Sequence, residues 1–220
     1  MTTINDVIGL ANAQLVDTHW LRWSKSELLD YFNSALNAII IIRPDAGATI
    51  ETFDCVAGTR QSLPEGALRL LDVNRVVDGR AIQPVSREVL DYQFPDWHTL
   101  TGPVERYIYD EQTPRIFHLF PGAVFGTSLE ISVSRLPDTA TINDLKPGVN
   151  RSFPLDALYI NPVLEWILFR AFGKDSENGN YAMLSSQHYQ TFVDLLGVKS
   201  QTDQAAGQKK QMQSNGGAAS

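Results

Sequence analysis

Two carboxylates and the single thiol of the chain lie within five residues of one another, at Glu51, Asp54 and Cys55. A carboxylate pair can act as general acid and base, and a thiolate can act as a nucleophile. Residues three apart in an extended strand point to opposite faces, so Glu51 and Asp54 are not expected to share a site. Cys55 has no histidine near it in the sequence to act as a base, and we predict a small buried thiol there.

The four histidines have no metal-ligand spacing; they are His19, His98, His118 and His188. We predict structural roles for His118 and His188, the latter as an interhelical residue with satisfied hydrogen bonds. The sequence also lacks a glycine-rich phosphate loop, a His-Glu-x-x-His pair and a Gly-x-Ser-x-Gly motif. The prediction is therefore no catalytic residue, no metal site and no cofactor, in a protein that is not an enzyme.

The charge and hydropathy of the chain limit its partners. It carries 18 basic and 25 acidic residues, a formal net charge of −7. Proteins that bind nucleic acid tightly neutralise its phosphates with an excess of basic residues. Sequence-specific DNA binding is therefore not expected, whereas this acidic charge is compatible with DNA that passes the protein without being bound. The longest strongly apolar run, residues 39–42, is far shorter than the ~20 residues of a membrane-spanning helix. We expect no membrane partner.

A helix is predicted over residues 24–42, preceded by a shorter helix over residues 4–14. Ser24 and Glu27 have the spacing of a capping box, in which each side chain bonds to the other residue's backbone amide. Apolar residues then recur at helical spacing, and Pro44 ends the element because it disfavours a helical residue before it.

The next hundred residues alternate short apolar runs with turns, which indicates strands. The predicted strands are residues 68–77, 81–85, 104–109, 115–120 and 129–133. Asp78-Gly79 favours a tight hairpin turn, because both residues accept positive φ. With one short helix over residues 87–93, the segment is predicted to form an antiparallel unit of five or six strands.

Helical patterns return after residue 150. We predict a helix from Pro154 with a kink within residues 158–162, because Pro162 removes a backbone donor, and a final helix that Gly197 ends. The whole is an α+β fold in which an antiparallel β domain is inserted into a helical bundle. The predicted domains are residues 1–48 with 150–197 for the bundle, 49–149 for the β domain and 198–220 for an extended tail.

The tail contains glutamine, alanine, glycine and serine, with Val198 and Met212 as its larger apolar residues. Such a segment buries too little apolar surface to offset the backbone entropy of ordering, about 1–2 kcal/mol per residue. We expect it to be disordered in an isolated subunit and to order on a partner. The predicted partner-binding residues are Arg170, Lys174, Lys199, Lys209, Lys210 and Met212, with a solvated surface as the alternative.

An ordered series of short motifs carries a resemblance to a known family. The motifs are Trp23 with residues 27–29, Asn33, residues 43–45, 61–64 and 66–67, 95–98, 114–117, Phe120-Pro121, residues 168–172 and Lys174-Asp175. In this order, over nearly residues 5–197, the chain resembles head-to-tail adaptor proteins of tailed bacteriophages, of the connector or gatekeeper type.

The resemblance implies a structural virion protein of the neck or tail, from a short-tailed phage, assembled in the host cytoplasm. It implies a dodecameric ring of subunits that docks under the portal protein, contacts the next tail component (a nozzle or tail tube) and extends the channel for DNA packaging and ejection. Genomic DNA would pass without sequence-specific binding. Two alternatives stay open: another phage tail or baseplate subunit, and a small hydrolase or nuclease.

Overall fold

The chain divides into two compact units in the computed structural model, which describes the backbone of residues 1–174 and 179–215 and the side chains of residues 1–174 and 179–197. One unit comprises Met1–Ile42 and Asp138–Ser220, and the other comprises Arg43–Pro137. The first contains four α-helices, and the second contains seven strands and one short α-helix within the described residues. The predicted α+β class is confirmed.

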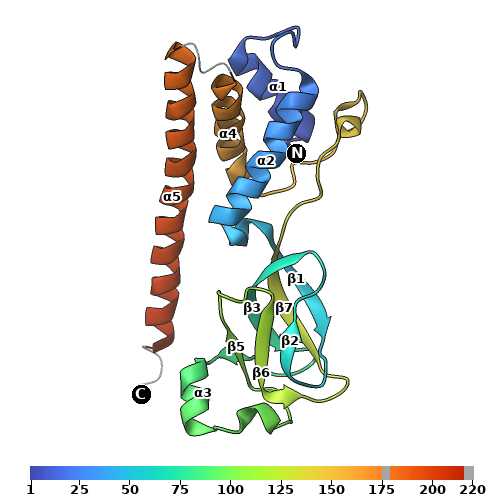
Figure 1. The fold of residues 1–220 in the computed structure, drawn as a ribbon, viewed down its shortest axis with the longest axis vertical. Coiled ribbons are helices and arrows are strands. Elements are labelled where there is room, and N and C mark those ends of the chain that lie inside the picture. The colour runs from blue at the N-terminus through green and yellow to red at the C-terminus, as the bar shows by residue number, and fades with distance from the viewer. Residues whose placement is uncertain (175–178, 216–220) are drawn as a thin grey trace. The chain divides into compact units, whose positions relative to one another are not determined.

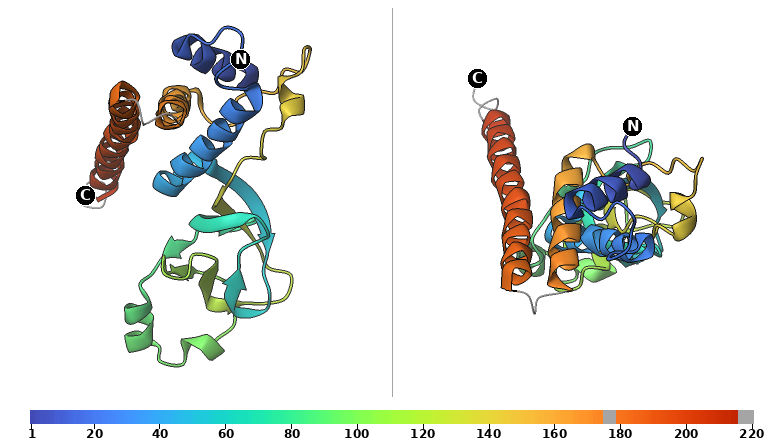
Figure 2. Two further views of the ribbon diagram at one scale, coloured as in Figure 1. Left: turned by 45° about the horizontal axis from the view of Figure 1, so that its top comes forward. Right: turned by 90° about the horizontal axis from the view of Figure 1, so that it is seen from above.

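The helical unit is organised around one central helix. Its helices are α1 (Ile4–Leu15), α2 (Lys25–Ile42), α4 (Ile160–Gly173) and α5 (Gly179–Asn215), with the 3-10 turns η3 (Ile142–Leu145) and η4 (Ala157–Tyr159). Helix α4 contacts α1, α2 and α5, and it lies between α2 and α5 in both Figures 1 and 2. Its buried residues include Val163, Ile167 and Leu168, so burial on several sides holds the unit together.

Helix α2 begins where the sequence predicts, but only half of the capping box forms. The Glu27 amide donates to the Ser24 hydroxyl at 3.2 Å. The Glu27 carboxylate bonds to Lys174 and Tyr31, since a cation and a phenol from the folded unit are available to it. A complete capping box is present at α1, between Thr3 and Asp6.

The start predicted for the helix after residue 150 is wrong. Helix α4 begins at Ile160, after η4, rather than at Pro154. Pro162 therefore lies in the first turn of α4, where a missing N–H costs no helical hydrogen bond, and the kink expected there has no cause.

The predicted end of the final helix at Gly197 is also wrong, because α5 continues to Asn215. A glycine ends a helix when it adopts the left-handed conformation, and Gly197 does not adopt it. The alanine, glutamine and lysine residues that follow it have good helix propensity.

The β unit contains two sheets that share a core. The strands are β1 (Ala48–Asp54), β2 (Gly58–Ser62), β3 (Ala67–Val76), β4 (Gln83–Pro84), β5 (Arg106–Tyr109), β6 (Ile116–Ala123) and β7 (Ser128–Arg135). The sheet orders are β1-β7-β3 and β2-β6-β5-β4. Leu129, Ile131 and Val133 of β7 are fully buried, as their alternation predicts. They pack in one cluster with Phe117 and Leu119 of β6.

The strands predicted over residues 68–77, 104–109, 115–120 and 129–133 correspond to β3, β5, β6 and β7, but β1 and β2 were not predicted as separate strands, and the described β unit has seven strands rather than five or six. The hairpin of β5 and β6 is antiparallel, and Asp78 takes the expected positive φ of 56°. The strand predicted over residues 81–85 forms only a bridge to β3, and β4 pairs in parallel with β5. Helix α3 (Arg87–Gln93) matches its prediction, and with the turn η2 (Trp97–Thr99) it covers a second small core.

Candidate partner-binding surface

Two of the predicted partner-binding residues lie together at the end of α4. Arg170 and Lys174 line a pocket of about 390 Å³ with Tyr31, Phe169 and Gly173. The Arg170 guanidinium lies 5.7 Å from the centroid of the Tyr31 ring, close enough for a cation–π contact. The pocket is thus lined by two aromatic side chains and two cations.

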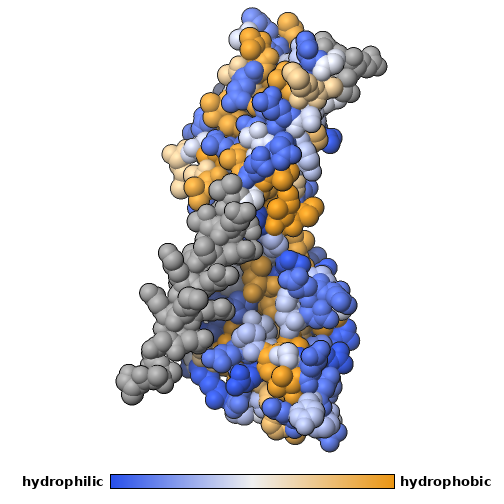
Figure 3. Space-filling model, turned by 90° about the vertical axis from the view of Figure 1, so that its left-hand side faces the viewer, coloured by the Kyte–Doolittle hydropathy of each residue, from blue (hydrophilic) through white to orange (hydrophobic). Residues whose placement is uncertain are grey.

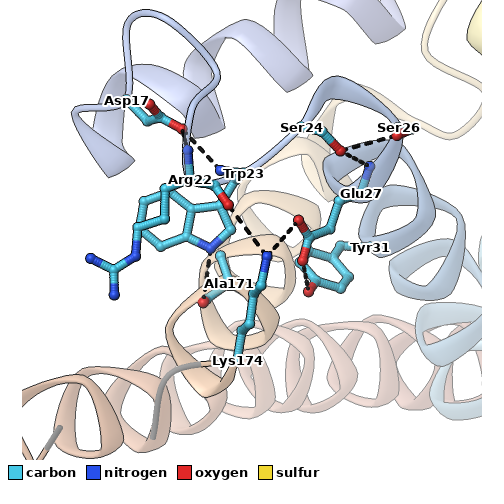
Figure 4. A network of polar contacts seen from close by, with 9 residues as sticks. All are labelled: Asp17, Arg22, Trp23, Ser24, Ser26, Glu27, Tyr31, Ala171 and Lys174. Atoms are coloured by element: carbon cyan, nitrogen blue, oxygen red, sulfur yellow. Dashed lines mark hydrogen bonds and ion pairs between the residues drawn. The ribbon is translucent and has the colours of Figure 1, made fainter.

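Contacts across the helical unit hold Lys174 in place (Figure 4). Its ammonium donates to the Glu27 carboxylate at 2.9 Å and to the Arg22 carbonyl at 3.3 Å. The other Glu27 oxygen accepts from the Tyr31 hydroxyl at 2.8 Å. Burial, with the bond to Glu27, raises the pKa of Tyr31 to about 12, so the phenol remains a donor and holds Glu27 toward Lys174.

The loop between α1 and α2 is the second support of this surface. The Asp17 carboxylate accepts from the backbone amides of Leu21, Arg22 and Trp23 at 2.9–3.0 Å. These bonds, with that from Trp23 the largest contributor, lower the pKa of Asp17. The Trp23 indole donates to the Ala171 carbonyl at 3.1 Å (Figure 4). The loop is therefore fastened to the last turn of α4.

Aromatic residues join α4 to α5. Phe172 stacks on Tyr181 and on His188, with ring centroids 5.5 Å apart in both pairs. His188 Nδ1 lies 2.7 Å from the Glu165 carboxylate, which confirms the interhelical role predicted for it.

Helix α5 also leaves apolar side chains at the surface, and orange apolar atoms are visible over the helical unit on the side that carries α5 (Figure 3). The exposed large residues of its described part are Met183, Tyr189, Val193 and Leu195. Scattered apolar residues are normal on a surface, but these four share one helix with the predicted partner-binding tail.

Four of the predicted partner-binding residues lie where the side chains are not described. Lys199, Lys209, Lys210 and Met212 fall within the backbone range of α5, and their side chains lie outside the described residues. Their role in binding stays a prediction.

The carboxylates considered for acid–base chemistry serve the β unit as polar pairs. Glu51 accepts from Arg135 at 2.9 and 3.0 Å, and Asp54 accepts from Ser128 at 2.7 Å. No group of three potential metal ligands occurs among the residues that the structure describes. His98 and His118 do approach each other, with ring centroids 5.8 Å apart, which their positions in the sequence did not indicate.

A comparison with protein families decides between the remaining classes. Residues 2–214 match the SU10 adaptor protein family. The chain belongs to this family. It is accordingly a bacteriophage head-to-tail adaptor, a structural protein of the virion neck with portal and tail partners, and not a member of an enzyme class. No curated protein sequence matches the chain significantly.

Within this adaptor, long-range polar contacts were the part of the site that sequence analysis missed. The Trp23 and Ala171 partners are separated by 148 residues, and Glu27 and Lys174 by 147. Both pairs include residues of the motifs that carry the family resemblance, which was the one signal in the sequence for these contacts.

In the described part of the chain, no helix is long and apolar enough to cross a membrane.

The Glu27–Lys174 pair of the adaptor is expected to contribute about 0.5–1 kcal/mol to stability, because both side chains are partly exposed. A double-mutant cycle with Glu27→Gln and Lys174→Met in urea unfolding measures this coupling. The exposed Arg80–Glu105 pair of the β unit serves as the control and should couple more weakly. A coupling of zero between Glu27 and Lys174 would show that the pair does not position Lys174.

Cys55 is expected to be unreactive in the folded adaptor. The thiol predicted to be buried is half-buried in the structure. This burial, and secondarily the charge of Asp54, raise the pKa of the thiol to about 12, and only the thiolate reacts. Alkylation by iodoacetamide at pH 8 should be at least about a hundredfold slower than in urea, where the pKa returns to about 8.5, and should accelerate with rising pH. Similar rates in the folded and unfolded protein would contradict the burial of this thiol.

Proposed function

We propose that this adaptor forms a dodecameric ring that docks under the portal of a short-tailed phage and extends the DNA channel toward the tail. The observation that carries the proposal is the family match over residues 2–214. The acidic balance of the chain supports a channel component, since dense cations would bind DNA phosphates and retard sliding. Genomic DNA then passes during packaging and ejection without sequence-specific binding.

The helical unit, as a bundle, makes the portal contact in this proposal. Arg170 and Lys174 present cations beside an aromatic pocket. The hydrogen bonds of Glu27 to Lys174 and of Trp23 to Ala171 hold the end of α4 in place. The outer half of α5 orders fully on the portal or on a neighbouring subunit, through Lys199, Lys209, Lys210 and Met212. The free energy of assembly therefore includes the entropic cost of ordering this segment. The β unit contacts the next tail component, a nozzle or tail tube.

Subunits stay monomeric until the portal templates the ring in the host cytoplasm. Sedimentation velocity of the purified adaptor, alone and with purified portal, tests this. We expect a single species near the subunit mass of 24.5 kDa without portal and one large complex with it. Subunit rings formed without portal would indicate a self-assembling tail component, and a monomer in both samples would contradict a portal adaptor.

A further inference from the structure

The β unit contains a groove of about 910 Å³ on the outer face of the β2-β6-β5-β4 sheet. Arg60 of β2 lies opposite His118 of β6, which in turn lies opposite Ile108 of β5. Residues opposite one another in antiparallel strands project to the same face, so a cation, an imidazole and an apolar residue form one row. The volume is in the range of sites that bind small ligands or peptide side chains.

The two histidines of the groove are held by a fixed tryptophan. Trp97 is 1% exposed, and its indole donates to the Asp91 carboxylate at 2.8 Å. The His98 ring stacks on Trp97 with centroids 3.6 Å apart, and His118 meets Trp97 edge-on at 5.9 Å. His98 Nδ1 also lies 3.3 Å from the Thr59 hydroxyl. The imidazoles therefore have defined positions, which a binding site requires.

The charges around these histidines favour an anion over a metal ion. Arg60 and Arg87 line the same groove. Burial, and then the cations of His98, Arg87 and Arg60, lower the pKa of His118. The Arg60 guanidinium would repel a divalent cation beside His118, whereas it attracts a carboxylate and can bond it through two N–H groups. Asp91 bridges Arg87 at 3.3 Å, while no carboxylate bridges Arg60 in the part of the chain that the structure describes.

We propose that this groove binds an acidic segment of a protein partner, with a carboxylate held by Arg60, His98 and His118 and an apolar neighbour packed against Val85 and Ile116. The half-buried Val85 and Ile116 side chains supply the apolar wall.

The rim of the groove distinguishes a peptide from DNA. Glu88, Asp110 and Glu111 also line the groove, and they repel a chain of successive phosphates more strongly than a ligand with one negative charge. A peptide with one carboxylate can present it to Arg60 and the two histidines and keep uncharged residues beside Glu88, Asp110 and Glu111. The groove is thus selective for a short acidic and apolar sequence.

Binding should strengthen as the pH falls. A bound carboxylate favours the imidazolium form of His118 and raises its pKa from the lowered value of the free protein, so protons are taken up on binding. The charged groups that face His118 are Arg60 from β2, Arg87 from α3 and His98 from η2. Each proton taken up allows up to a tenfold change in affinity per pH unit.

The probe is a blocked hexapeptide with one central glutamate flanked by leucine and serine residues, titrated into the full chain without portal, so that the outcome does not depend on oligomeric assembly. By calorimetry we expect a dissociation constant below 1 mM at pH 5.5 and about tenfold weaker binding at pH 7.5. NMR of the imidazole protons should show perturbed signals for His98 and His118 and a raised pKa for His118. The same peptide with glutamine in place of the glutamate should not bind.

Arg60→Gln and His118→Gln should each weaken the binding of the hexapeptide at least tenfold. His98→Gln, at an exposed position, gives a second test in case the His118 variant fails to fold. Arg80→Gln removes the same charge from the β unit outside the groove and should leave binding unchanged. The proposal is overturned by an absence of binding at pH 5.5, by equal binding of the glutamine peptide, by tighter binding of hexathymidylate, or by an equal loss in Arg80→Gln.

Discussion

Replacing Trp23 by alanine is expected to lower the free energy of unfolding of the helical unit by about 3–5 kcal/mol. Trp23 is 3% exposed, and its ring packs edge-on against Phe172 with centroids 6.2 Å apart. The substitution leaves a cavity and removes the donor that the Ala171 carbonyl accepts from. Urea unfolding, followed by circular dichroism at a helical wavelength, measures the change.

Leu21→Ala is the matched control for this substitution. Leu21 is in the same loop but is 87% exposed, so its truncation should change stability by less than about 0.5 kcal/mol. If the Trp23 variant unfolded like the wild type, the loop between α1 and α2 would not fasten α4. If both variants lost the same stability, the effect would come from the loop backbone rather than from the indole.

Removing residues 198–220 is expected to impair assembly on the portal while leaving the subunit folded. The buried anchors of α5, Phe192 and Leu196, precede the cut, so the unfolding transition should be close to that of the full chain. Binding to purified portal, measured by sedimentation, should weaken at least tenfold, or by ~1.4 kcal/mol or more per subunit.

A chain shortened after Asn215 retains all of α5 and should assemble normally. A further full-length variant replaces Lys199, Lys209 and Lys210 by glutamine. It separates the effect of the lysine charges on portal binding from the effect of helix length. If the 1–197 chain assembled like the full chain, the outer half of α5 would have no part in docking, and the contact would have to come from the end of α4.

The elements with strong local signals were predictable from the sequence. Helix α2 was found by its periodicity and its Ser24 cap, and strands β5 and β6 were found as short apolar runs between turns. The parallel pairing of β4 was not found, because a two-residue strand has no periodicity and its partner is set by tertiary structure. The length of α5 was missed because Gly197 was given more weight than the helix propensity of the residues after it.

The residues that carry the family resemblance form polar contacts that fix loops. The Asn33 side chain bonds to both backbone groups of Ala140. Gln61 is fully buried, and its amide bonds to the backbone of Val56 and Gly58. Single-sequence reasoning identifies such residues only as part of an ordered motif series, because the partners of Asn33 lie 107 residues away.

The groove that contains His98 and His118 could not be predicted from the spacing of these residues in the sequence. His98 and His118 are twenty residues apart in the sequence and have no metal-ligand spacing, so the sequence did not predict that they lie together. They meet because η2 packs on the sheet face that carries His118. The register that places Arg60 beside His118 is likewise a property of strand pairing and not of local sequence.

The most direct test of the adaptor account is a cryo-electron microscopy map of the purified adaptor bound to its portal. We expect twelve subunits in a ring on the tail-facing side of the portal, with the surface around Arg170 and Lys174 and the outer half of α5 at the contacts. A map in which the portal is contacted through the β unit alone, or in which no subunits are bound, would contradict the account.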